Sequence, residues 1–282
     1  MTENNSQSTN IFAQQSQSKL ESLSKDLGFD IPVDLAQLPS KGLVYAVEHP
    51  FCGSEQVEVK CMTTREEDLI TSRALIKKGT VITELLKSCL MNKSVNVDTL
   101  LVGDRNALLI TIRVSGYGSD YVVEIECPDC SEKFKNTFKL DALTIKRLGT
   151  NPDSPNSNQF SYTLPLSGLN IKFKLLTGAD EFEITQEAEK KKKVGMQTDN
   201  VISRRLFYSI MSVNGETDKN KIARIVSNLR AGDSLALRKH IDSVEPGVDM
   251  NQQVTCQHCG AGSEVDVPIG PTFFWPDYGS KG

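Results

Sequence analysis

The sequence is poor in the features that mark several common functions. Only 6% of its 282 residues are aromatic, and it contains one tryptophan and three histidines. No apolar run approaches the roughly 18 residues of a membrane-spanning helix, and the first residues lack the basic start and apolar stretch of a secretory signal. The formal net charge is only −4, whereas dedicated nucleic-acid-binding domains are usually strongly basic. We therefore expect neither a membrane protein nor a signal-directed exported protein, and no dedicated nucleic-acid binder.

Signals of catalysis are equally scarce. The histidines His49, His240 and His258 lie in no metalloprotease motif, and the sequence has no phosphate-binding loop or dinucleotide fingerprint. The glycine-rich stretch SGYGSD precedes a predicted strand instead of opening a helix, which is typical of a turn. A Ser-His-Asp triad has no signature of its own in one sequence, and nothing here points to one. We expect a protein that is not an enzyme.

Cysteine is the residue type that carries chemical information here. There are seven, and four of them form two Cys-x-x-Cys pairs, Cys127/Cys130 and Cys256/Cys259. Zinc prefers four sulfur or nitrogen ligands in a tetrahedron, and each such pair supplies two thiolates. In a chain of this size without an export signal, paired cysteines are more typical of metal ligands than of disulfides. The sequence therefore predicts one structural zinc site formed by both pairs.

Other interpretations of these cysteines stay open. The pairs are also compatible with unrelated thiols or a redox motif, and His258, inside the second pair, is a further candidate ligand. A catalytic zinc keeps an open position, usually with histidine or carboxylate ligands, so four cysteines favour a structural ion. The pairs are about 125 residues apart, which exceeds the spacing of compact zinc ribbons. This separation predicts a domain inserted between two ribbon halves, with zinc joining a mid-chain hairpin to the C-terminus.

Helical patterns occupy the region before the first cysteine pair. Thr64 and Glu67 have the spacing of a capping box, and the helix that they open is expected to end at Gly79. A second helix starts at Thr80, and a third follows Asp104, its expected N-cap. These segments predict a small helical cluster.

Period-two alternation predicts β-hairpins around both cysteine pairs and over residues 162–176. Asp233 or Ser234 is expected to cap the last long helix. Amphipathic patterns predict further helices over residues 201–213, 219–228 and 231–243. The fold class is therefore α+β, with helical clusters, antiparallel hairpins and a split zinc-ribbon-like pair of cysteine knuckles.

The chain divides into three predicted regions. Residues 1–30 are rich in Asn, Gln and Ser and are expected to form a flexible N-terminal arm, which is either an inert tail or a segment that orders on a partner. Residues 31–116 form a strand and helical region. Residues 117–282 form a hairpin and helical region closed by the split ribbon, either separate from 31–116 or in one compact domain with it.

The C-terminal segment FFWPDY concentrates Phe273, Phe274, Trp275 and Tyr278 in a chain with few aromatic residues. Aromatic side chains are enriched in the hot spots of protein interfaces. These four residues are therefore candidate interface residues. The alternative is that they cover the core next to the zinc hairpin.

Several segments carry a family resemblance through their order along the chain. They are LPSKGLVY, MTTREEDLI, KGTVITELLKSC, LLVGDRNALLITIRVSGYG, CPDC, FKLLTGADE, PGVDM, CQHCG and FFWPDYG. From about Leu38 to Tyr278, the chain resembles the baseplate hub and hub-assembly proteins of T-even-like contractile-tail bacteriophages. The resemblance implies a non-enzymatic structural or assembly component of the central hub, located in the virion tail baseplate and assembled in the host cytoplasm. The implied partners are other baseplate hub and tail proteins, with no membrane or nucleic acid, and an oligomer within the hub is compatible with it.

Two other functions are weighed against this one. A zinc-ribbon regulator that binds nucleic acid is supported by the cysteine pairs and the lysine run at 190–193, but such runs are usually solvated helix faces, and the acidic balance opposes it. A metalloenzyme would need a metal with an open coordination position.

Overall fold

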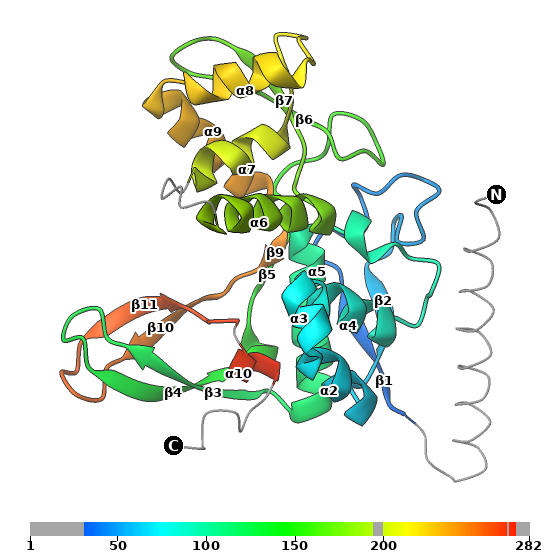
Figure 1. Cartoon of the computed structure of the whole chain (residues 1–282), viewed down its shortest axis with the longest axis vertical. Coiled ribbons are helices and arrows are strands. Elements are labelled where there is room, and N and C mark those ends of the chain that lie inside the picture. Colours follow the sequence, from blue (N-terminus) through cyan, green and yellow to red (C-terminus); the bar gives the residue numbers. More distant parts are fainter. Residues whose placement is uncertain (1–30, 194–199, 270, 275–282) are drawn as a thin grey trace. The chain divides into compact units, whose positions relative to one another are not determined.

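The computed structural model describes residues 31–193, 200–269 and 271–274 of the chain (Figure 1). The predicted N-terminal arm, residues 1–30, and the interface candidates Trp275 and Tyr278 lie outside the described residues. The described residues from Asp34 onward make up one compact unit. Among the described helices, none is long and apolar enough to span a bilayer.

The first part of the described chain forms a two-stranded sheet and a group of helices. In chain order these elements are β1 (Val33–Gln37), β2 (Gln56–Lys60), α2 (Thr64–Thr71), α3 (Arg73–Lys78), α4 (Val81–Cys89), the 3₁₀ helix η1 (Val97–Thr99) and α5 (Val102–Tyr117). β1 pairs with β2, and α4 packs against both α2 and α5. This is the helical cluster that the sequence predicts.

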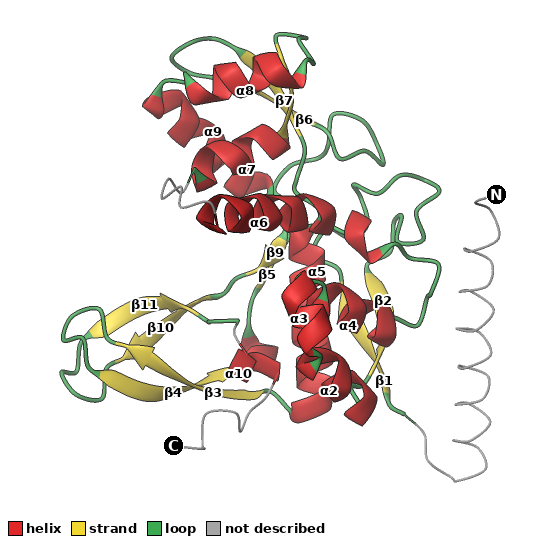
Figure 2. Cartoon of the chain, in the orientation of Figure 1, coloured by secondary structure: helices red, strands yellow, loops and turns green. Residues whose placement is uncertain are grey.

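The second part alternates short strands with helices (Figure 2). Its elements are β3 (Asp120–Glu126), β4 (Lys133–Lys139), the 3₁₀ helix η2 (Leu140–Ala142), β5 (Ile145–Lys146), β6 (Phe160–Thr163), β7 (Asn170–Phe173), α6 (Gly178–Lys193), α7 (Val201–Ser209), β8 (Ile210–Val213), α8 (Lys219–Ser227), α9 (Ala231–Val244), β9 (Gly247–Val248), β10 (Asn251–Thr255), β11 (Gly262–Asp266) and α10 (Pro271–Phe274). The antiparallel sheets are β3–β4, β5–β9, β6–β7–β8 and β10–β11. The fold class is α+β, as predicted.

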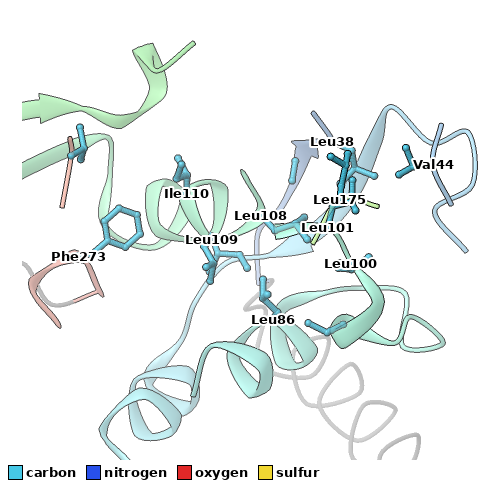
Figure 3. Packing of buried hydrophobic residues seen from close by; sticks show 14 of the residues in the cluster. Leu38, Val44, Leu86, Leu100, Leu101, Leu108, Leu109, Ile110, Leu175 and Phe273 are labelled. Carbon is cyan, nitrogen blue, oxygen red and sulfur yellow. The ribbon is translucent and has the colours of Figure 1, made fainter. Parts of the chain in front are cut away.

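Helix α5 lies at the centre of the core. Its buried residues are Gly103, Asp104, Ala107, Leu108, Leu109, Ile110, Ile112 and Arg113. In Figure 3 the consecutive side chains of Leu108, Leu109 and Ile110 point in different directions, and Leu86 and Phe273 come to the helix from distant segments. A helix that is buried on several sides needs neighbours around it, so α5 organises the packing of both parts of the chain.

The first helix of the cluster differs in register from the prediction. Its N-cap is Thr63, not Thr64, and the carboxylate of Glu66 accepts hydrogen bonds from the Thr63 N–H (3.0 Å) and hydroxyl (2.6 Å). The adjacent Thr-Thr and Glu-Glu pairs offer the capping-box spacing in two registers, so spacing alone does not choose between them. The chain is extended at Ser72, which divides the single predicted helix into α2 and α3. Gly79, with φ of 71°, ends α3 as predicted.

Asp104 does not cap α5. The helix starts at Val102, and Asp104 is fully buried in its first turn. One carboxylate oxygen accepts the Ser40 N–H at 2.9 Å, and the other accepts the hydroxyls of Ser40 (2.5 Å) and Tyr45 (2.6 Å). Burial raises the pKa of Asp104. This carboxyl group ties the segment after β1 to the start of α5.

The predicted helix over 201–213 is wrong in its last turn. Helix α7 ends at Ser209, and Ile210–Val213 is strand β8, which pairs with β7. A short apolar run has no periodicity that distinguishes helix from strand, and pairing with β7 decides in favour of the strand.

The expected cap of α9 is also wrong. Arg230 occupies the N-cap position, so neither Asp233 nor Ser234 does. Asp233 is buried inside the first turn, where one carboxylate oxygen accepts a backbone N–H from the β6–β7 turn at 2.8 Å. The Asp233 side chain, which sequence spacing assigns to the helix end, therefore binds a distant loop instead.

Candidate metal centre

The four paired cysteines lie at the tips of two hairpins. Strands β3 and β4 pair along their full length, as do β10 and β11, and each hairpin turns at a Cys-x-x-Cys motif (Figure 1). We call residues 127–132 the first knuckle and residues 256–261 the second knuckle. The two hairpins together form the knuckle arm.

The two knuckles share one backbone pattern. In each, the N–H of the first cysteine donates to the carbonyl five residues on, and the N–H four residues on donates to the carbonyl of that cysteine, at 2.9–3.0 Å. Ser131 and Gly260 occupy the same left-handed position, with φ of 58° and 74°. Glycine adopts this conformation without strain, so Gly260 suits this position in the second knuckle. The matching geometry explains the similar strand–knuckle–strand patterns of the sequence.

The four Sγ atoms lie within 4.8 Å of one another. Cys127 and Cys259 are 3.8 Å apart, and Cys130 and Cys256 are 3.7 Å apart. A tetrahedral ion with a Zn–S distance of about 2.3 Å places its sulfurs about 3.8 Å from each other, whereas a disulfide bond is about 2.05 Å long. The spacing therefore fits four thiolates around one metal ion. The predicted convergence of the two pairs is confirmed, and zinc as the ion stays a prediction.

The thiols of the cluster differ in acidity. Backbone N–H groups of Cys259 and His258 lower the pKa of the Cys256 thiol to about 6. The Glu132 N–H lowers the pKa of Cys130, but desolvation and hydrogen bonds with the three other cysteines outweigh it and raise that pKa to about 12. The thiolate is the form that binds a metal, so the backbone N–H groups that face Cys256 favour the form that a ligand needs.

Two side chains of the second knuckle attach it to β4. The Gln257 amide donates to the Lys135 carbonyl at 3.0 Å, and the His258 Nε2 lies 3.2 Å from the Lys133 carbonyl. A carbonyl oxygen only accepts, so the imidazole is the donor. His258 thus lies outside the group of four sulfurs and positions the knuckle. The sequence did not reveal these contacts, because nothing in the spacing pairs residue 258 with residue 133.

The aromatic residues of α10 are buried. Phe273 is 0% exposed and Phe274 is 6% exposed. The Phe273 ring packs edge-on against Tyr121 of β3, with centroids 5.4 Å apart. Phe273 and Phe274 therefore cover the core next to the knuckle arm, which is the alternative to an interface role that the sequence leaves open.

Arg113 is a positioning residue that the sequence did not reveal. It is fully buried in α5 and donates to the carbonyls of Phe273, Gly118 (2.8 Å) and Asp120 (3.3 Å). A guanidinium carries five donors in a fixed fork, which suits two carbonyls where α5 passes into β3 and one carbonyl of the distant α10. The only signal in the sequence is a charged residue within the apolar pattern of the third predicted helix.

The fold and this centre define an α+β protein whose distant segments meet in one cluster of thiols. A family model described as "T4 bacteriophage base plate protein" matches residues 38–275, which is most of the chain. The chain belongs to this family, and it is a structural protein of the phage tail baseplate with other tail proteins as its partners. No curated protein and no solved structure matches the chain.

Proposed function

We propose that this chain is a structural or assembly component of the central hub of the baseplate and that its clustered cysteines hold a structural zinc ion. The family match over residues 38–275 carries the baseplate role. The ordered segments that resemble hub and hub-assembly proteins support the hub in particular. The chain acts through contacts with hub and tail proteins, without catalysis, and it joins the growing tail in the host cytoplasm.

The geometry of the cysteine cluster supports the zinc. Four sulfurs at tetrahedral spacing complete the coordination of one ion and leave no position for a substrate. Binding of a structural zinc contributes on the order of 10 kcal/mol to a folded state. In this chain that free energy would hold the second knuckle against the first. The ion would therefore fix the knuckle arm as one body.

The hub assignment is tested by deleting the gene. Cells infected with the deletion phage are expected to accumulate baseplate parts without a central hub, as seen by negative-stain electron microscopy. Expression of the wild-type chain in the host should restore complete tails, and the tagged chain should co-purify with hub proteins. Complete, infectious tails from the deletion phage would contradict the proposal.

The zinc is tested with Cys127→Ser and Cys256→Ser in the full chain. Elemental analysis is expected to find about one zinc per wild-type chain and far less in either variant, because three sulfurs no longer close the site. The melting temperature should fall by roughly 10 °C or more, since 1 kcal/mol corresponds to about 2–4 °C at this size. Cys52→Ser is the matched control and should keep both values. Unchanged zinc content and melting in both variants would refute the shared site.

A further inference from the structure

The two edges of the β3–β4 hairpin present their backbones outward at alternate residues. In an antiparallel pair, residues between the hydrogen-bonded positions direct both N–H and C=O away from the partner strand. The ladder bonds just beyond the two ends of the strands fix this phase. Val122, Glu124 and Glu126 therefore face outward on β3, and Lys133 and Lys135 face outward on β4.

One of these edges is covered and the other is open. On β4, the carbonyls of Lys133 and Lys135 accept hydrogen bonds from the second knuckle. On β3, no hydrogen bond from any described part of the chain reaches the backbone groups of Val122, Glu124 or Glu126. A row of unpaired backbone donors and acceptors is a template for pairing with another strand.

The side chains along β3 give this open edge a definite chemistry. Val122 is 51% exposed, and Glu124 and Glu126 lie on the same outer face. On the inner face, Val123 and Ile125 are only half-buried against the core. The carboxylate of Glu124 faces Lys133 at 3.7 Å, but both side chains are more than half exposed, and such surface pairs contribute little. The edge thus combines apolar contacts with two available carboxylates.

A second copy of the β3–β4 hairpin is a poor partner for this edge. Pairing β3 with β3 of another copy brings acidic residues opposite acidic residues, and like charges across a strand pair are destabilising. Pairing β3 with β4 of another copy is opposed because the second knuckle already binds the Lys133 and Lys135 carbonyls of that edge. The charge pattern instead complements a basic strand.

We propose that the open edge of β3 binds an extended segment of another baseplate protein, which adds to the sheet as a strand. The partner carries lysine or arginine opposite Glu124 and Glu126 and an apolar residue opposite Val122. Between these positions it carries apolar side chains, which extend the cover over Val123 and Ile125. Main-chain hydrogen bonds supply affinity in this mode of recognition, and alternate side chains supply specificity. The proposal rests on the proposed baseplate role only in taking the partner to be another baseplate protein.

Peptide binding to the full, zinc-loaded chain tests the strand addition directly. The probe is a fluorescein-labelled peptide of alternating valine and lysine, and the matched probe alternates valine and glutamate. Fluorescence anisotropy is expected to show saturable binding of the lysine peptide and none of the glutamate peptide. Hydrogen exchange should slow at the amides of Val122, Glu124 and Glu126 when the lysine peptide binds. Binding without this protection would mean charge attraction alone and would overturn strand addition.

Two variants make the test specific to this edge. Glu124→Pro removes an outward N–H without touching a ladder bond, and it should weaken the lysine peptide at least tenfold. Glu264→Pro, at an outward position of β11, is the matched control and should bind as wild type does. The charge reversal Glu124→Lys with Glu126→Lys keeps the backbone and should transfer binding to the glutamate peptide. Equal affinity of wild type and these β3 variants would overturn the proposal, whatever the deletion phage shows about the hub.

Discussion

Glu66 is a carboxylate that the helical cluster keeps charged although its side chain is fully buried. It accepts hydrogen bonds from the Lys60 ammonium (2.6 Å), the Ser88 hydroxyl (2.5 Å) and the capping residue Thr63. Burial raises the pKa of Glu66, but these donors outweigh burial and lower it from 4.5 to about 2. One side chain thereby joins β2, α2 and α4.

This depressed pKa predicts how stability depends on pH. The charged form contributes stability above the unfolded pKa, near 4.5, and the contribution is lost as the pH falls through the folded pKa of about 2. Glu66→Gln should therefore be less stable at pH 7 by about 3 kcal/mol, and the difference should shrink on acidification. Urea unfolding at pH 7 and pH 3 measures both values. Exposed Glu48→Gln is the control, and a difference that stays constant down to pH 3 would contradict the assignment.

At the scale of elements, several of the sequence segments that carry the family resemblance meet at the start of α5. Ser40 and Tyr45 of LPSKGLVY bind Asp104 of LLVGDRN. Leu101 bridges to Thr177 of FKLLTGADE. The backbone of PGVDM packs against Gly103. Segments that are separate in the sequence thus form one buried junction, which gives a physical reason for their occurrence together.

Gly103→Ala tests how tightly this junction is packed. A Cβ at residue 103 would collide with the carbonyl of Pro246, which is backbone and has no side-chain freedom to move away. We expect a loss of at least about 2 kcal/mol, the usual range for overpacking. Gly262→Ala is the matched control, because a Cβ there meets nothing within 4 Å. Thermal unfolding compares the two, and equal melting temperatures would show that the helix start tolerates a side chain.

The sequence predicts those elements whose signals are local. Gly79 ends α3 where it is expected to end a helix, and the cysteine hairpins follow from period-two alternation. Asp104 was misread because its partners, Ser40 and Tyr45, are 64 and 59 residues away. No spacing rule relates residues that are so far apart in the sequence. An aspartate near a helix start can therefore cap the helix or bind a distant segment, and spacing alone does not distinguish these two roles.

At the scale of the whole molecule, the end of the described chain belongs to the core. Phe273 is buried against Tyr121, and the Arg113 guanidinium donates a hydrogen bond to the Phe273 carbonyl. The Tyr121 hydroxyl also donates to the Pro268 carbonyl at 2.8 Å. The convergence of the four cysteines could be predicted from their types and spacing, but these attachments could not, because they depend on which distant backbone groups the fold brings within reach.

The cysteine cluster brings Cys130 next to Cys256, which lies 126 positions further along the chain, and Cys127 next to Cys259, which lies 132 positions further. The two halves of the cluster are therefore synthesised at different times. A ribosome makes the chain from its N-terminus, so Cys127 and Cys130 exist long before Cys256 and Cys259. The first two thiols can hold an ion only incompletely while all the intervening helices are made. A complete four-sulfur site therefore marks a chain that has been translated beyond Cys259, and a chain that terminates before Cys256 lacks the second pair.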